Sequence, residues 1–240
     1  MQNRSWSDIY KIECQMAQSA MGKVYLAIRK TDNKKFAVKV IEKTSSNERQ
    51  MIINDSSLIA YLDSDELIKC VDLYYFDRKV FIFMEYMENG PIKSIIQGTK
   101  QDTRRAYSEK FCKYTLYKVA KGLEKMHNRN VLHRDINSDN IMTSMDGSVK
   151  LADLGFSVIL SKLEAYRKKK RLTPNWVGPE IAQGVKYSKE VDVWEFGCFA
   201  YALATGDPPF SQVRRRNELL KHIIHEEVPP IDSTRWSAEF

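Results

Sequence analysis

The pattern of strand-forming residues and turn residues predicts a strand-rich first third of the chain. Four segments combine β-branched and aromatic residues and are separated by turn residues such as Thr31-Asp32-Asn33. One helix is expected to interrupt them, because Ser45 and Glu48 have the spacing of a capping box. The expected strands cover residues 23–30, 35–41, 71–76 and 80–86, and the inward stripe of the helix comprises Ile52, Asp55, Ile59 and Leu62.

The second part of the chain has the periodicity of helices. Residues 88–91 (ENGP) resemble a linker, and amphipathic helices are expected over 108–127, 189–204 and 217–227. We therefore predict an α+β protein with a small β-rich N-lobe (1–87), a hinge (88–91) and a larger helical C-lobe (92–240). A cleft between two such lobes is a favoured ligand site. The expected inward faces are Cys112, Leu116, Val119, Leu123 and Met126, then Val191, Trp194, Cys198 and Tyr201, and finally Leu219, Leu220, Ile223 and Ile224.

Composition and charge exclude several classes of protein. The chain has 240 residues, of which 43% are hydrophobic, so it is neither disordered throughout nor too short to bury a core. Its net charge of 38 − 31 = +7 is concentrated in the runs 167–171 (RKKKR) and 214–216 (RRR). A local excess of this kind does not predict a nucleic-acid-binding surface.

The location of the protein is predicted from its cysteines and its apolar runs. The four cysteines form no paired motif, which is typical of reduced thiols in a cytoplasmic protein. Residues 1–10 contain no apolar signal-peptide region, and runs such as 80–84 (VFIFM) are too short to span a bilayer.

Five short motifs carry the candidate chemistry. The segment 133–140 (HRDINSDN) places an aspartate and an asparagine five residues apart after a long helix. The segment 152–155 (ADLG) follows a short expected strand over 148–151, and 36–39 (FAVK) places a lysine inside another strand. Two more motifs follow, at 173–180 (TPNWVGPE) and 192–197 (DVWEFG).

In this order and at these separations, the motifs resemble those of the eukaryotic protein kinases. The resemblance runs from about Ile9 to the C-terminus, and it is greatest to the sterile-twenty branch of Ser/Thr kinases. The segments 84–87 (MEYM), 132–140 and 173–180 support that branch. The resemblance implies a bilobal kinase fold and transfer of the γ-phosphate of ATP to a protein hydroxyl.

The resemblance also implies roles for individual residues. Lys39 would bind the α- and β-phosphates of ATP, and Asp135 would accept the proton of the substrate hydroxyl. Asp153 and Asn140 would bind Mg²⁺, a hard cation that takes oxygen ligands. Thr173 would lie beside Asp135, an arrangement that favours serine and threonine as substrates.

The nucleotide site would lie on the N-lobe sheet. Counting back from Leu67 places Asp55 as the acidic partner of Lys39, the same residue that periodicity puts on the inward face of the helix. Glu48 is the competing candidate for that partner. The resemblance implies that Val24, Ala37 and Met142 line the adenine pocket, that Met84 is the gatekeeper, and that the backbone of Glu85 and Met87 meets the adenine edge.

The sequence departs from the family pattern at several positions. The phosphate loop 17–24 (AQSAMGKV) retains only the third of three glycines, and Leu154 replaces a phenylalanine. Asn137 stands where the family has a lysine, so one cation beside the transferred phosphate is missing and turnover is expected to be low. By that argument Asn137→Lys should raise turnover. The chain ends at 236–240 (WSAEF), so we expect a C-lobe without the last helices of the family.

The activation loop is expected to work without its usual phosphate. Lys169 occupies the place that is phosphorylated in related kinases, and it cannot attract Arg134 because both are cations. The basic run 167–171 therefore predicts an acidic partner, although a solvated loop without a role explains the same residues.

Three functions remain open at this stage. The first is an ATP- and Mg²⁺-dependent Ser/Thr kinase with low turnover. The second is a pseudokinase that binds a nucleotide or a partner, and the third is a truncated gene product.

Overall fold

A computed structural model describes residues 5–19, 22–42, 61–101, 108–154, 157–160, 173–232 and 234–237, with the backbone alone at 19 and 99–101. It forms two compact units, residues 1–88 and 89–240. None of the helices in the described ranges is long and apolar enough to cross a membrane. The expected helix after Ser45, including Asp55 and Glu48, lies outside the described residues except for its last two positions, Tyr61 and Leu62.

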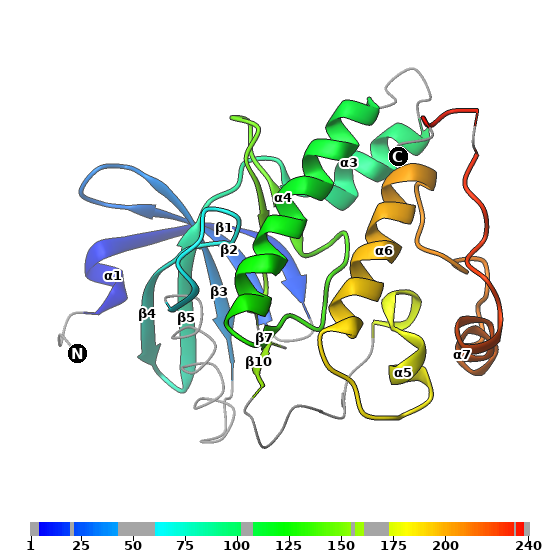
Figure 1. Cartoon of the computed structure of the whole chain (residues 1–240). Coiled ribbons are helices and arrows are strands. Elements are labelled where there is room, and N and C mark those ends of the chain that lie inside the picture. The colour runs from blue at the N-terminus through cyan, green and yellow to red at the C-terminus, as the bar shows by residue number, and fades with distance from the viewer. Residues whose placement is uncertain are drawn as a thin grey trace. The chain divides into compact units, whose positions relative to one another are not determined.

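The first unit is a five-stranded antiparallel sheet with the order β1-β2-β3-β5-β4 (Figure 1). The four predicted strands are present, each within one residue of its expected bounds. The segment before them forms a further strand that was not predicted, although apolar residues alternate along its first half. The elements are α1 (Trp6–Ile9), β1 (Tyr10–Ser19), β2 (Gly22–Arg29), β3 (Lys35–Ile41), β4 (Cys70–Phe76) and β5 (Lys79–Glu85).

One face of this sheet is packed with aromatic side chains. Phe36, Val38 and Val40 of β3 are buried there, because alternate residues of a strand point to the same face. The Tyr10 ring stacks on Phe83 with a centroid separation of 4.0 Å. The Tyr10 hydroxyl donates a hydrogen bond to Asp72 of β4. Burial, together with this bond, raises the pKa of Tyr10.

The second unit is mainly helical, and α4 and α6 run side by side in it (Figure 1). The predicted helices are confirmed with small shifts at their ends, and the short α3 was not predicted. Residues 90–91 of the expected linker pair with Thr143 and Met142 as a short strand. The elements are β6 (Gly90–Pro91), α3 (Ile92–Gln101), α4 (Glu109–Asn128), β7 (Val131–Leu132), β8 (Ile141–Thr143), β9 (Val149–Leu151), β10 (Val158–Ile159), a 3₁₀ helix (Pro174–Trp176), α5 (Pro179–Ala182), α6 (Glu190–Thr205) and α7 (Arg216–His225).

The core of the second unit contains the predicted helical stripes. Four of the five expected residues of α4 are buried, and the fifth, Leu116, is half-buried. The α4 helix begins one residue after its predicted start, because Ser108 is the N-cap and its side chain accepts a hydrogen bond from the Phe111 N–H at 3.2 Å. The cluster that supports α6 comprises Leu132, Val177, Ile181, Tyr187, Val191, Phe210, Leu219 and Ile223.

Gly22, the glycine that remains in the phosphate loop, has a packing role. A β-carbon at this position would lie 2.3 Å from the carbonyl oxygen of Val40 on the neighbouring strand. Backbone atoms cannot move aside cheaply, so only glycine fits between β2 and the end of β3. The retention of Gly22 is therefore explained by the sheet alone.

We predict that Gly22→Ala destabilises the protein. Overpacking of this kind costs about 2 kcal/mol, which lowers the melting temperature by about 4–8 °C in a chain of this size. Differential scanning calorimetry measures the change. The matched control is Gly98→Ala in α3, where a β-carbon would have no close neighbour within the described part of the chain. Equal melting temperatures for the two variants would contradict the packing role.

Candidate active site

The loop that carries Asp135 is attached to α6 through Asp192. One carboxylate oxygen of Asp192 accepts the Arg134 N–H at 2.7 Å, and the other accepts the His133 N–H at 2.9 Å. The second oxygen also lies 2.8 Å from Nε2 of His127 on α4. Asp192 is fully buried, and a buried carboxylate is stable only when such donors satisfy it. The position of Asp192 therefore determines the position of the loop.

Glu195 provides a second attachment one turn further along α6. Its carboxylate accepts the Ile136 N–H at 2.8 Å and is 1% exposed. Glu195 lies in the 192–197 motif, and its role was not predicted from the sequence. Its signal was present, because Asp192 and Glu195 fall three residues apart on the buried side of a helix whose apolar face includes Val191 and Cys198.

The Asp135 carboxylate is oriented by two hydrogen bonds. Oδ1 accepts the hydroxyl of Thr173 at 2.6 Å, and Oδ2 accepts the side-chain amide of Asn140 at 2.8 Å. The Asn140 amide nitrogen also donates to the Asp135 carbonyl at 2.8 Å. The structure thus brings together three residues from motifs that are up to 38 positions apart. Asp135 is 9% exposed, so its carboxylate is nearly buried.

His133 connects the two ends of the loop. Its Nδ1 accepts the Asp135 N–H at 3.2 Å, which leaves Nε2 to donate to the Ala152 carbonyl at 3.1 Å. Burial lowers the pKa of His133, so the ring is held neutral in this tautomer. This role of His133 was not predicted from the sequence, because a buried imidazole that only organises backbone has no distinctive pattern.

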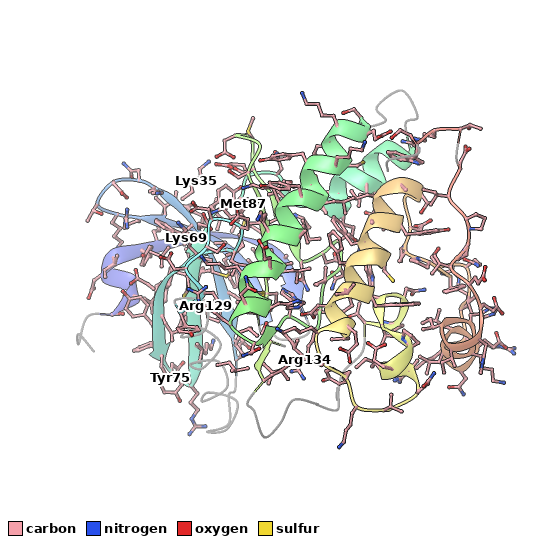
Figure 2. All side chains as sticks on the ribbon, viewed as in Figure 1. Lys35, Lys69, Tyr75, Met87, Arg129 and Arg134 are labelled. Atoms are coloured by element: carbon pink, nitrogen blue, oxygen red, sulfur yellow. The ribbon has the colours of Figure 1, made fainter. Side chains whose placement is uncertain are left out.

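Arg134 adopts a backbone conformation that is rare for a residue with a side chain. Its φ is +67°, and the Asp192 hydrogen bond to its N–H holds it there. Its guanidinium donates to the hydroxyl of the buried Tyr187 at 3.0 Å. Figure 2 shows Arg134 close to the start of α6. Asp192 thus holds the backbone of Arg134 and Tyr187 holds its guanidinium, and both residues belong to the second unit.

Asp153 is brought to the Asn140 end of the loop by a hairpin. Ile141 of β8 pairs with Leu151 of β9, and the Ala152 N–H donates to the Asn140 carbonyl at 2.8 Å. Asp153 follows with a φ of +60°. The next residue, Leu154, is 3% exposed and fills an apolar position.

The residues expected around a nucleotide share one face of the sheet in the first unit. Lys39 pairs with Val24 on one side and Ile82 on the other, and Ala37 pairs with Met84. Directly opposed residues of antiparallel strands lie on the same face, so these side chains gather opposite the aromatic face. Lys39 is 8% exposed, unlike a lysine on a solvated strand.

Glu85 and Met87 follow on the segment after β5. Glu85 is anchored, because its N–H donates to the Lys69 carbonyl at 3.1 Å and its carboxylate accepts the Lys69 N–H at 2.7 Å. Met87 is buried, with 6% of its surface exposed. Met87 and Lys69 are both labelled in Figure 2. Met142, the remaining expected pocket residue, belongs to the second unit, where it pairs with Lys150.

The phosphate loop forms a close hairpin. Strand pairing continues through Ala17 with Val24 and Gln18 with Lys23 to Ser19 with Gly22, with residues 20 and 21 outside the described residues. The predicted partner of Lys39, Asp55, also lies outside the described residues.

The donor atoms at the Asn140 end of the loop suit a hard cation. The Asn140 amide nitrogen is committed to Asp135, so the amide oxygen is the atom that this side chain offers to a ligand. Asp153 adds a carboxylate that the hairpin brings to the same end. An amide oxygen and a carboxylate are ligands that Mg²⁺ accepts while keeping several waters.

Comparison with known proteins agrees with this geometry. Residues 10–238 match the protein kinase domain. The chain is 30% identical over 234 residues to serine/threonine-protein kinase pakC of Dictyostelium discoideum, covering 97% of this chain and 48% of that protein. It is 29% identical over 204 residues to serine/threonine-protein kinase STE20 of Kluyveromyces lactis, covering 85% of this chain and 20% of that protein. It is also 29% identical over 240 residues to serine/threonine-protein kinase 10 of Danio rerio, covering 98% of this chain and 24% of that protein.

The chain thus spans about half or less of the length of these relatives. The domain match covers nearly all of this chain, and the motifs at 36–39, 133–140 and 152–155 lie within it. The chain belongs to the protein kinase domain family, and its relatives are Ser/Thr kinases of the sterile-twenty branch.

Proposed function

We propose that this chain is a protein Ser/Thr kinase that transfers the γ-phosphate of ATP to a protein hydroxyl with low turnover. The observation that carries the proposal is the Asp135 carboxylate, which Thr173 and Asn140 orient from both sides. A base must present a fixed lone pair to the hydroxyl proton, and two hydrogen bonds to a nearly buried carboxylate provide that fixation. Thr173 beside Asp135 also favours serine and threonine substrates.

The remaining residues bind and neutralise the phosphates. Lys39 supplies a buried ammonium on the sheet face that also carries Val24, Ala37 and Met84, which form an apolar surface suited to a purine ring. With Met142 and the backbone of Glu85 and Met87, these residues would hold ATP. Asn140 and Asp153 would hold Mg²⁺. When bound, Mg²⁺ neutralises charge on the phosphate oxygens.

An alternative is a pseudokinase that binds a nucleotide or a partner without turnover. The observation that favours it is Asn137, which is 3% exposed and is hydrogen-bonded to the backbone of its own loop. This side chain provides no cation for a transferred phosphate. The small residues Ala17 and Ser19 in the phosphate loop favour the same alternative.

We predict that ATP with Mg²⁺ stabilises the chain through Lys39 and Asp153. At about a hundredfold excess of ligand over Kd, the melting temperature should rise by about 5–10 °C. Lys39→Ala and Asp153→Ala should each remove this rise, because they delete the phosphate cation and a metal ligand. Thermal-shift assays with and without Mg²⁺ measure it.

Lys35→Ala is the matched control for this binding experiment. Lys35 starts the same strand but is exposed to solvent, so its loss should leave the ATP-induced rise intact. An undiminished rise in both Lys39→Ala and Asp153→Ala would show that the nucleotide binds elsewhere.

We predict that phosphate transfer depends on the orientation of Asp135. In a radiolabel assay on a generic protein substrate, Asp135→Asn should abolish transfer, and Thr173→Val should lower kcat by about tenfold because one orienting hydrogen bond is lost. As a control, Thr205→Val removes a hydroxyl that lies 2.9 Å from the backbone carbonyls of Tyr201 and Asp207 at the end of α6, and it should leave kcat unchanged. Nucleotide binding without any transfer in the parent chain would support the pseudokinase instead.

We also propose that an acidic partner binds the basic run 167–171. The basis is the sequence alone, because residues 161–172 lie outside the described residues. A labelled poly-glutamate peptide should bind the parent chain and lose most of its affinity in 300 mM salt. Salt weakens a charge-driven contact because it screens the charges: the Debye length is about 10 Å at 0.1 M and shortens as salt is added. Replacing the five cations by glutamine should abolish binding, whereas replacing Arg214, Arg215 and Arg216 should not. Equal loss in both variants would contradict a specific role for the loop.

A further inference from the structure

The Asn137 side chain is built into the loop that carries Asp135, residues 133–140, and is not directed to solvent. Its Nδ2 donates to the Asp135 carbonyl at 3.1 Å, and its Oδ1 accepts the Asp139 N–H at 2.9 Å. The residue is 3% exposed. One short amide thus connects the backbone before it to the backbone after it, a local bridge that asparagine makes readily and lysine cannot make.

The Asp135 carbonyl, which accepts from Asn137, also accepts a second hydrogen bond. The Asn140 amide donates to the same oxygen at 2.8 Å, so both lone pairs of the Asp135 carbonyl are engaged. The Asn140 N–H in turn donates to the Asn137 carbonyl at 3.0 Å. Residues 135–140 therefore form a closed set of hydrogen bonds around the backbone of the proposed base.

A second contact anchors the same loop from outside. The N–H of Lys93 at the start of α3 donates to the Ser138 carbonyl at 3.1 Å. The Lys93 ammonium pairs with both carboxylate oxygens of Asp139 at 2.8 and 3.0 Å, in an exposed position. An exposed ion pair contributes little, so the buried amide of Asn137 is the stronger constraint on Asp139.

We propose that Asn137 is a positioning residue for the phosphoryl-transfer reaction, holding the Asp135 backbone through its amide N–H and the Asp139 backbone through its amide oxygen. This inference rests on the proposed kinase function. In this chain the loop is fixed by hydrogen bonds at the position where the family places a cation. Asn137→Lys therefore loses both bonds and yields no gain in turnover, the opposite of the outcome expected from the sequence.

The two halves of the amide can be tested separately. Asn137→Asp keeps an acceptor for the Asp139 N–H but loses the donor to Asp135, and Asn137→Ala loses both. Hydrogen exchange of the Asp139 amide, measured by NMR, should quicken by about tenfold in Asn137→Ala and stay slow in Asn137→Asp. The kcat should fall by about ten- to hundredfold in both variants, with the KM for ATP within about twofold of the parent value.

Lys93→Met is the matched control. It removes the exposed ion pair to Asp139 but keeps the backbone bond to Ser138, so Asp139 exchange and kcat should both remain within about twofold of the parent values. A merely structural role for Asn137 would lower the melting temperature without this split between kcat and KM.

The outcomes separate this proposal from the proposed function. Unchanged exchange of Asp139 in Asn137→Ala, or a higher kcat in Asn137→Lys, overturns the positioning role. A parent chain without any turnover overturns the kinase proposal and the catalytic consequence with it. Even then the exchange measurement decides whether the amide bridge exists, because it needs no substrate.

Discussion

Two buried carboxylates on α6 are the constraint on which the loop that carries Asp135 depends. Asp192 and Glu195 together accept the backbone N–H groups of residues 133, 134 and 136, in the loop that carries Asp135. Charge-assisted bonds of this kind are strong in a buried setting, and either carboxylate without its donors would be costly. The helix and the loop therefore stabilise each other, and the unusual φ of Arg134 is one consequence.

The conformation of this loop is then fixed by the side-chain amides of two asparagines and by one imidazole. His133 fixes Asp135 and Ala152, Asn140 fixes the Asp135 carboxylate, and Asn137 spans the turn between them. The loop thus owes its shape to polar bonds, whereas the surrounding helices owe theirs to apolar packing.

The sequence predicted the strands and helices, which have a periodic residue pattern. It did not predict the roles of residues whose positions depend on individual hydrogen bonds. The strands of the sheet and the stripes of α4 and α6 follow from period and burial, so their bounds were nearly right. The strand β1 was missed because Cys14 and Met16 are exposed and the alternation is not confined to one buried face. The roles of His133, Glu195 and Asn137 were missed because each depends on a backbone group distant in sequence or hidden within a turn, which residue type alone does not reveal.

The hydrogen bond between Tyr10 and Asp72 has a consequence for how the first unit forms. Strands β1 and β4 are the opposite edges of the sheet, yet this bond joins them across its aromatic face over a separation of 62 residues. Contacts that distant along the chain are slow to form, because a long loop must close before they contribute. During synthesis β1 can pair with β2 at once, but the Tyr10 side chain would lack Asp72 and Phe83, and Trp6 of α1 would lack Phe81, until β4 and β5 have been made. Until then the aromatic side chains of this face are exposed, and transiently exposed apolar surface of this kind is prone to aggregation.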